Sequence, residues 1–161
     1  MSMAILDSLH DSSKVWIYQS DRPFQEQDIP LIKAKIQQFA AHWVSHNRAL
    51  KAYGDIFHNR FLVLMVDETQ AGASGCSIDT SVRFMQHLQA EYGVDLFNRM
   101  QFSFEQDGNV HTVPREEFQN LYQKGAIDDQ TNVFDTLVNT KKDFQTGFVK
   151  PLKESWHQRM L

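Results

Sequence analysis

The sequence predicts an α+β domain in which helices cover one face of an antiparallel sheet. Two segments carry apolar residues at helical spacing, and two pairs of β-rich runs are joined by short turns. The elements come in the order β-α-β-β-α-β-β-α. The first six follow the plan of a ferredoxin-like βαββαβ core, and an extra hairpin strand and a C-terminal helical extension come after them.

The predicted sheet begins with residues 14–20, KVWIYQS, which alternate in polarity and are rich in β-formers. Residues 28–46 then predict a helix, with Asp28 as its cap and Pro30 in its first turn. The apolar face of this helix consists of Ile29, Ile32, Ile36, Phe39, Ala40 and Trp43.

A β-hairpin follows the first helix. Residues 51–57 and 60–68 are β-rich, and the pair His58-Asn59 lies between them. The second run, RFLVLMVDE, is apolar on both faces. It therefore predicts a central strand that is covered on both sides.

The second helix is predicted over residues 77–93, with Ser77 or Asp79 as its cap and Gly93 as its C-terminal stop. Its apolar stripe consists of Ile78, Val82, Met85, Leu88 and Tyr92.

The second half of the chain predicts another hairpin, a short helix and a mixed tail. Asp107-Gly108 joins residues 100–106 to 109–113, and 114–124 form the helix. Residues 131–139 fit either a strand or an extended loop, and Pro151 splits or kinks the last helical pattern.

The domain organisation follows from length and composition. The chain has 161 residues, 42% hydrophobic and 22% charged, which suits one folded domain over residues 14–161. Residues 1–13 are polar and predict a flexible N-terminal segment. An apolar stripe of Phe144, Phe148, Leu152 and Trp156 either covers the sheet or forms an oligomer contact.

Charge and hydropathy exclude several classes of partner. The net charge is −4 and no basic run occurs, which argues against nucleic-acid binding. The N-terminus has no signal-peptide pattern, and no apolar run approaches the length of about 20 residues that spans a bilayer. We therefore expect a soluble, cytoplasmic protein without a membrane partner.

Residues 61–79, FLVLMVDETQAGASGCSID, resemble parts of a nucleotide hydrolase. A hydrophobic strand ending in Asp67-Glu68 is typical of the segment that holds Mg²⁺. A hydrolase of this type also needs a GxxxxGK[ST] phosphate loop, and the sequence contains none. This argues against an ATPase.

Four segments carry a resemblance to a known family: KAYGDIFHNRFLVLMVDE, SGCSIDTSVRF, VPREEF and PLKESWH. Together they resemble a family of small uncharacterised Bacteroidetes proteins that often carry the automatic label "ABC transporter ATPase". The resemblance covers nearly the whole chain from Lys14. It implies no established activity, substrate or catalytic residue.

The segment from Gly72 to Arg83 is a candidate anion site. Amides in the first turn of a helix attract anions, and hydroxyls and an arginine lie close by in sequence. The candidate ligand-binding residues are Gly75, Cys76, Ser77, Thr80 and Arg83. The alternative is that the polar residues only cap the helix and the glycines only turn the chain.

Cys76 is the only cysteine, and a helix dipole at this position would favour its thiolate. One hypothesis is therefore a thiol-dependent enzyme in which Cys76 acts beside Asp67 or Glu68. The other is a small buried cysteine without chemistry. His42 and His46 have the spacing of a metal pair but lack a third ligand, so no metal and no cofactor are expected. The sequence leaves the function unknown and favours a domain that binds a small anion or a protein partner.

Overall fold

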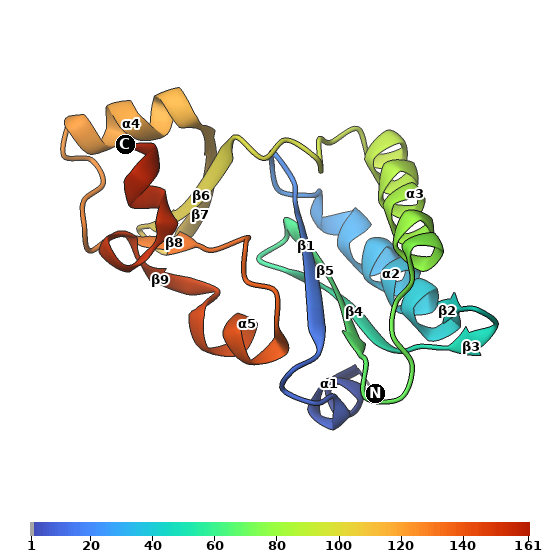
Figure 1. The fold of residues 1–161 in the computed structure, drawn as a ribbon. Helices are drawn as coiled ribbons and strands as arrows, with labels where there is room; N and C mark the ends of the chain where they lie inside the picture. Colours follow the sequence, from blue (N-terminus) through green and yellow to red (C-terminus); the bar gives the residue numbers. More distant parts are fainter. Residues whose placement is uncertain (1) are drawn as a thin grey trace.

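The computed structural model describes residues 2–161 and contains two main β-sheets that lie side by side (Figure 1). Every strand pairing is antiparallel, with 41% helix and 27% strand, which confirms the α+β class. The helices and strands are α1 (Ser2–Ser8), β1 (Lys14–Gln19), η1 (Glu26–Asp28), α2 (Ile29–His42), β2 (Val44–Ser45), β3 (Arg48–Ala49), β4 (Lys51–Phe57), β5 (Phe61–Asp67), α3 (Gly75–Tyr92), β6 (Gln101–Gln106), β7 (Asn109–Pro114), α4 (Arg115–Gln123), β8 (Asn132–Phe134), α5 (Lys141–Gly147), β9 (Val149–Pro151), η2 (Leu152–Glu154) and η3 (Trp156–Met160).

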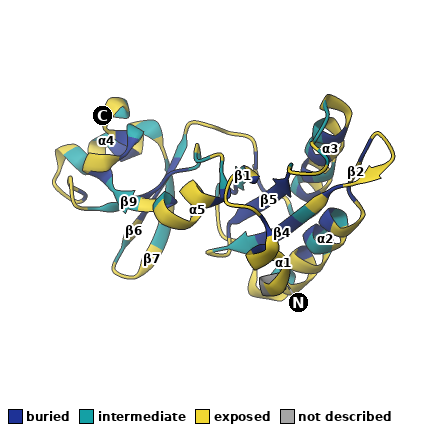
Figure 2. Ribbon diagram, turned by 60° about the horizontal axis from the view of Figure 1, so that its bottom comes forward, coloured by how far each residue is buried: buried dark blue, intermediate teal, exposed yellow. Residues whose placement is uncertain are grey.

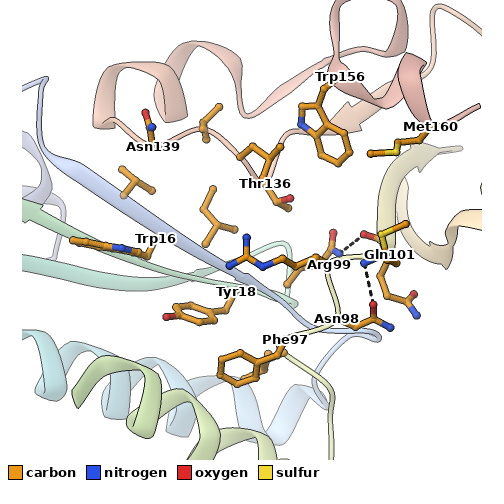
Figure 3. Close-up of a pocket in the computed structure, with 17 residues that line it drawn as sticks. Trp16, Tyr18, Phe97, Asn98, Arg99, Gln101, Thr136, Asn139, Trp156 and Met160 are labelled. Atoms are coloured by element: carbon orange, nitrogen blue, oxygen red, sulfur yellow. Dashed lines mark hydrogen bonds between the residues drawn. The ribbon is translucent and has the colours of Figure 1, made fainter. Parts of the chain in front are cut away.

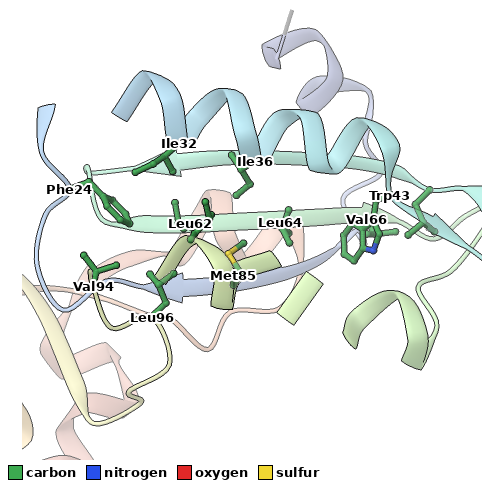
Figure 4. Packing of buried hydrophobic residues seen from close by; sticks show 12 residues of the cluster. Phe24, Ile32, Ile36, Trp43, Leu62, Leu64, Val66, Met85, Val94 and Leu96 are labelled. Atoms are coloured by element: carbon green, nitrogen blue, oxygen red, sulfur yellow. The ribbon is translucent and has the colours of Figure 1, made fainter. Parts of the chain in front are cut away.

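The first sheet has the strand order β1-β5-β4. The central strand β5 is buried at every position, as its apolar sequence predicted (Figure 2). On one face, Ile32 and Ile36 of α2 and Met85 of α3 pack against Leu62 and Leu64 (Figure 4). The opposite face belongs to a second cluster that reaches α1, β8 and α5.

The second sheet has the order β7-β6-β8-β9, with α4 and η3 packed against it. The Asp107-Gly108 hairpin is confirmed, and both residues have positive φ. A ferredoxin-like core is not confirmed, because β6 pairs with β7 and β8 and does not extend the first sheet. Within residues 2–161, the edge of β1 that such a core would use for β6 therefore has no neighbouring strand, and only an isolated bridge joins Lys14 to Thr140 there.

The first predicted helix ends four residues earlier than expected. Trp43 has extended backbone angles, φ −73° and ψ 129°, and its indole Nε1–H donates to the carbonyl of Ser77 at 2.9 Å. His46 lies in the turn between β2 and β3 with φ 51°. His42 and His46 therefore do not share a helix face.

The chain termini pack onto the two sheets. Leu6 and Leu9 at the N-terminus are buried in the second cluster, where the sequence predicted a flexible segment. Phe144 and Phe148 lie in the same cluster. The predicted C-terminal stripe is not one helix, because Val149–Pro151 form β9 and the chain then continues as η2 and η3.

A buried polar junction joins the two sheets beyond the β4–β5 turn. The Arg60 guanidinium donates to Thr112 Oγ1 at 2.9 Å and to the Val110 carbonyl at 2.8 Å. From β1, the Gln19 side chain donates to the Gln101 carbonyl at 2.8 Å and accepts from Ser103 Oγ at 2.6 Å. These contacts fix where β6 and β7 lie relative to β1.

Gly54 of β4 marks the closest approach of α2 to the first sheet. A Cβ atom at this position would lie 2.8 Å from the Ile36 carbonyl oxygen and 2.9 Å from Ile36 Cγ1. We expect Gly54→Ala to push α2 away and to lower the free energy of unfolding by about 1–3 kcal/mol. Urea denaturation measures this change.

Gly75→Ala is the matched control, because a Cβ at Gly75 meets nothing within 4 Å. Gly75 is in the first turn of α3, so alanine there should be neutral or stabilising by up to about 1 kcal/mol. Equal stability of the Gly54→Ala variant and the wild type would contradict the close packing of α2 on β4.

Candidate functional site

The N-terminus of α3 differs from the sequence prediction in its cap. Helix α3 begins at Gly75, and Ser74 caps it, so the assignment of the cap to Ser77 or Asp79 was wrong. Ser77 is the third helical residue and completes a capping box. Its amide donates to Ser74 Oγ at 3.2 Å, and its own hydroxyl accepts from the Ser74 amide at 2.7 Å.

Thr80 and Arg83, two further candidate anion ligands, also form hydrogen bonds within the helix. Thr80 Oγ1 donates to the Cys76 carbonyl at 2.9 Å, and Arg83 Nη2 donates to Thr80 Oγ1 at 3.3 Å. Ser77 is buried, whereas Gly75 is exposed and a Cβ atom there would have no neighbour within 4 Å. The geometry thus gives each hydroxyl a structural partner, and an anion site at this position stays a prediction.

Cys76 is exposed on the first turn of α3, so the alternative that it is a small buried cysteine was wrong. Within residues 4–161, no side chain forms a hydrogen bond with its sulfur. The thiol-enzyme hypothesis stays a prediction. Alkylation of the folded protein by iodoacetamide tests it, since a rate no faster than that of a free thiol rules out an activated sulfur.

Asp67 and Glu68 both hold backbone in place at the end of β5. Asp67 Oδ2 accepts from the His10 amide at 2.9 Å, and Oδ1 accepts from the amide and hydroxyl of Thr69 at 2.9 and 2.6 Å. Glu68 accepts from the Ala73 amide at 2.9 Å and lies 3.4 Å from Lys14 Nζ. Their carboxylates therefore attach the N-terminal segment and the β5–α3 loop.

Burial alone would raise the pKa of Asp67. The hydrogen bonds from Thr69 and His10, and the Lys51 ammonium 3.7 Å from Asp67 Oδ2, lower it by more. The pKa of Asp67 falls to about 2. A carboxylate that stays ionised to such low pH and has donors on both oxygens is suited to structure and is a poor general base.

A groove of about 460 Å³ runs along β1, between residues 96–101 and residues 136–139 (Figure 3). One wall carries Tyr18 and Phe97, whose ring centroids lie 5.6 Å apart in an edge-to-face arrangement. Trp156 and Met160 of η3 line the other side. The groove thus combines apolar side chains from β1, from two loops and from η3.

Several of the apolar side chains that line the groove are exposed to solvent. In residues 4–161, eight large hydrophobic side chains are exposed, and Phe97, Met100 and Leu137 are three of them. All three line the groove. This concentration of exposed apolar groups is typical of a binding surface.

Arg99 supplies the charge of the groove. In Figure 3 its side chain extends between β1 and the loop that carries Thr136. Arg99 is exposed and forms no ion pair with any residue in 4–161. Burial raises the pKa of the nearby Tyr18, and the positive charge of Arg99 opposes this rise.

The outer edge of β1 lies open within the groove. The Val15 amide donates to the Asn139 carbonyl at 3.0 Å, so odd-numbered residues of β1 point their backbone groups away from β5. In agreement, the amide of Ser20 points the other way and donates to Arg60. The N–H and C=O of Ile17 find no partner among the residues that the structure describes.

Carboxylates fix both loops that border the groove. Asp135 accepts from Lys150 Nζ at 2.7 Å, from Trp156 Nε1 at 2.8 Å and from the Leu137 amide at 3.0 Å. Burial alone would raise the pKa of Asp135, but these donors lower it. Asp95 holds the other loop by accepting from the Phe97 amide at 2.9 Å.

The sequence patterns did not predict this groove. Besides β1 and η3, its lining comes from the segment VDLFNRM after α3 and from the segment DTLVN after β8. The available signal was Phe97, an aromatic residue in a segment without helical or β periodicity. An apolar residue in such a segment either folds into a core or marks a surface that binds.

Comparison with protein-family models found no match, and neither the curated proteins nor the solved structures gave a significant match. The resemblance to the Bacteroidetes family stays a prediction. Within the described residues, no group of three or more His, Cys, Asp or Glu side chains is arranged to hold a metal ion. No helix in residues 2–161 is both long enough and apolar enough to cross a bilayer.

The role of Asp67 gives a prediction with a defined pH range. Asp67→Asn removes the charge and leaves one of the donors from His10 or Thr69 without an acceptor, which should cost about 1–3 kcal/mol at neutral pH. Because the folded-state pKa is depressed, the stabilisation is complete above the unfolded pKa. It should be lost as the pH falls from about 4 to about 2.

Urea denaturation at a series of pH values compares the wild type with Asp67→Asn, and Asp79→Asn, which is exposed on α3, is the control. The control should stay within about 0.5 kcal/mol of the wild type. A constant difference between the wild type and Asp67→Asn down to the lowest pH would show that the carboxylate charge does not stabilise this fold.

Proposed function

We propose that the protein acts by binding, and that its binding site is the groove along β1. The observation that carries the proposal is the Arg99 guanidinium, which has no ion pair within residues 4–161 and lies in a groove with exposed Phe97, Met100 and Leu137. A ligand with an apolar body and one carboxylate would satisfy both features, since an arginine pairs with a carboxylate through two hydrogen bonds.

Binding is also the functional class that the sequence favoured, but the sequence placed the site at the start of α3 and not in the groove along β1. At the start of α3, the hydroxyls of Ser77 and Thr80 already have partners in the helix. In the groove, the Arg99 side chain and the outward backbone groups of Ile17 have no partners among the described residues. Free donors are what a ligand uses, so the groove is the better supported of the two sites.

Nucleotide hydrolysis is not part of the proposal. Asp67 is the residue that would hold Mg²⁺ in that hypothesis, and its two oxygens accept from His10 and Thr69. A metal ion would have to displace these donors and so release the N-terminal segment.

Phenylbutyrate and its neutral amide, phenylbutyramide, test the groove. We expect phenylbutyrate to shift the amide NMR signals of groove residues, Phe97 and Leu137 among them, in a saturable way. The neutral amide should bind about tenfold more weakly. Arg99→Gln should remove this preference, because the charge on the protein is then absent.

Arg48→Gln is the matched control, since Arg48 is exposed on β3, has no ion pair in residues 4–161 and lies outside the groove. It should leave the preference unchanged. Shifts confined to residues 75–83 would contradict the groove and support the anion site on α3. The absence of any saturable shift would contradict binding of this ligand class.

A further inference from the structure

We propose that the groove is occupied by an extended peptide segment of a partner protein, which pairs with the outer edge of β1 and places a carboxylate against Arg99. This inference rests on the proposed function and names the class of partner. Each part of it follows from a group in the groove that has no partner among the residues that the structure describes.

The backbone of β1 provides the first argument. The Val15 amide is bonded to Asn139 at one end, and the Gln19 side chain is bonded to Gln101 at the other. Between these two contacts, the outward N–H and C=O of Ile17 form no hydrogen bond within the described part of the chain. An extended peptide satisfies such groups by adding a strand.

The composition of β1 provides the second argument. Soluble proteins protect open sheet edges with charges, prolines or bulges, because a bare edge pairs with other chains. β1 begins with the charged Lys14, but residues 15–19 read VWIYQ and contain none of these protective residues. An unprotected edge next to exposed apolar side chains is suited to a strand from a partner.

The side chains of β1 define what the peptide must carry. Trp16 and Tyr18 lie toward the α2–α3 cluster, whereas Val15 and Ile17 lie toward the cluster of α1 and α5. A peptide strand beside β1 would meet Phe97, which packs against Tyr18, on the side of the α2–α3 cluster. On the side of the α1 and α5 cluster it would meet Val138. Apolar residues at successive positions would therefore find apolar contacts on both faces.

Charge distinguishes a different protein from a second copy of this chain. Two copies that paired through β1 would bring together two VWIYQ segments, neither of which has an acidic residue. Both Arg99 side chains would then remain without a carboxylate from the added strand. A peptide with an aspartate or glutamate neutralises Arg99, so we assign the site to an acidic partner segment.

A set of six synthetic peptides tests the inference. Each is an acetylated, fluorescein-labelled hexapeptide that alternates valine or phenylalanine with threonine, and the aspartate occupies a different position in each. Fluorescence polarisation should detect binding at one or two aspartate positions. Exchange of that aspartate for asparagine, or Arg99→Gln in the protein, should weaken binding about tenfold, whereas Arg48→Gln should not.

N-methylation of the best peptide tests the pairing with β1 directly. A methyl group on every amide that faces β1 should abolish binding, and a methyl group on the alternate amides should leave it intact. On the protein, Ile17→Pro removes the free N–H, and Ile17→Ala removes the side chain but keeps the N–H. Ile17→Pro should bind about tenfold more weakly than Ile17→Ala.

The outcomes separate the two proposals. If phenylbutyrate binds in the groove but none of the six peptides does, the binding function stands and the peptide inference is overturned. If N-methylation has the same effect at every position, strand addition is overturned even where a peptide binds. A protein that is a dimer by light scattering, with Ile17→Pro making it monomeric, would assign the edge to a second copy and overturn the acidic partner.

Discussion

The relative position of the two sheets depends on one buried guanidinium and the aromatic rings beside it. Arg60 is 7% exposed, and it pairs with no carboxylate in the described chain, donating instead to Thr112 and Val110 of β7. Its neighbour Phe61 stacks on Phe134 of β8 with ring centroids 5.1 Å apart. Burial lowers the pKa of Arg60, which reflects the cost of taking this charge out of water. The hydrogen bonds to β7 offset part of this cost, since Arg60 Nε is buried without a partner among the described residues. They form only in the observed arrangement of the sheets, and the contact therefore fixes that arrangement.

This junction explains why β1 has an open edge. Because Gln19 and Arg60 hold β6 and β7 beyond the end of β1, the second sheet does not continue the first, and the edge of β1 faces two loops. Asp95 and Asp135 fix the backbone of these loops, so the groove is formed before any ligand arrives. A preformed site loses less conformational entropy on binding than a site that must first become ordered.

Local patterns in the sequence predicted most of the elements. The apolar run of β5, the positive-φ turns at His58-Asn59 and Asp107-Gly108, and the stop at Gly93 were all found where periodicity and turn residues placed them. The partner of β6 was not predicted, because strand order depends on long-range contacts such as Arg60 with Thr112 that leave no periodic signal. The groove was missed for the same reason, since Phe97, Arg99 and Leu137 lie in two loops that meet only in the fold. Cys76 and Asp67, in contrast, were predicted as candidate site residues from local motifs. In the structure, the Asp67 carboxylate accepts hydrogen bonds from the amides of His10 and Thr69.

The central claim is that the edge of β1 is open in the free protein, and amide hydrogen exchange of β1 tests it most directly. The amides of Trp16 and Tyr18 point toward β5, and the amide of Val15 is bonded to Asn139, so all three should exchange slowly. The amide of Ile17 should exchange much faster than its neighbours on either side, in an alternating pattern along the strand. If Ile17 is protected as strongly as Trp16 and Tyr18, the edge is already covered, and the groove is not a site for an added strand.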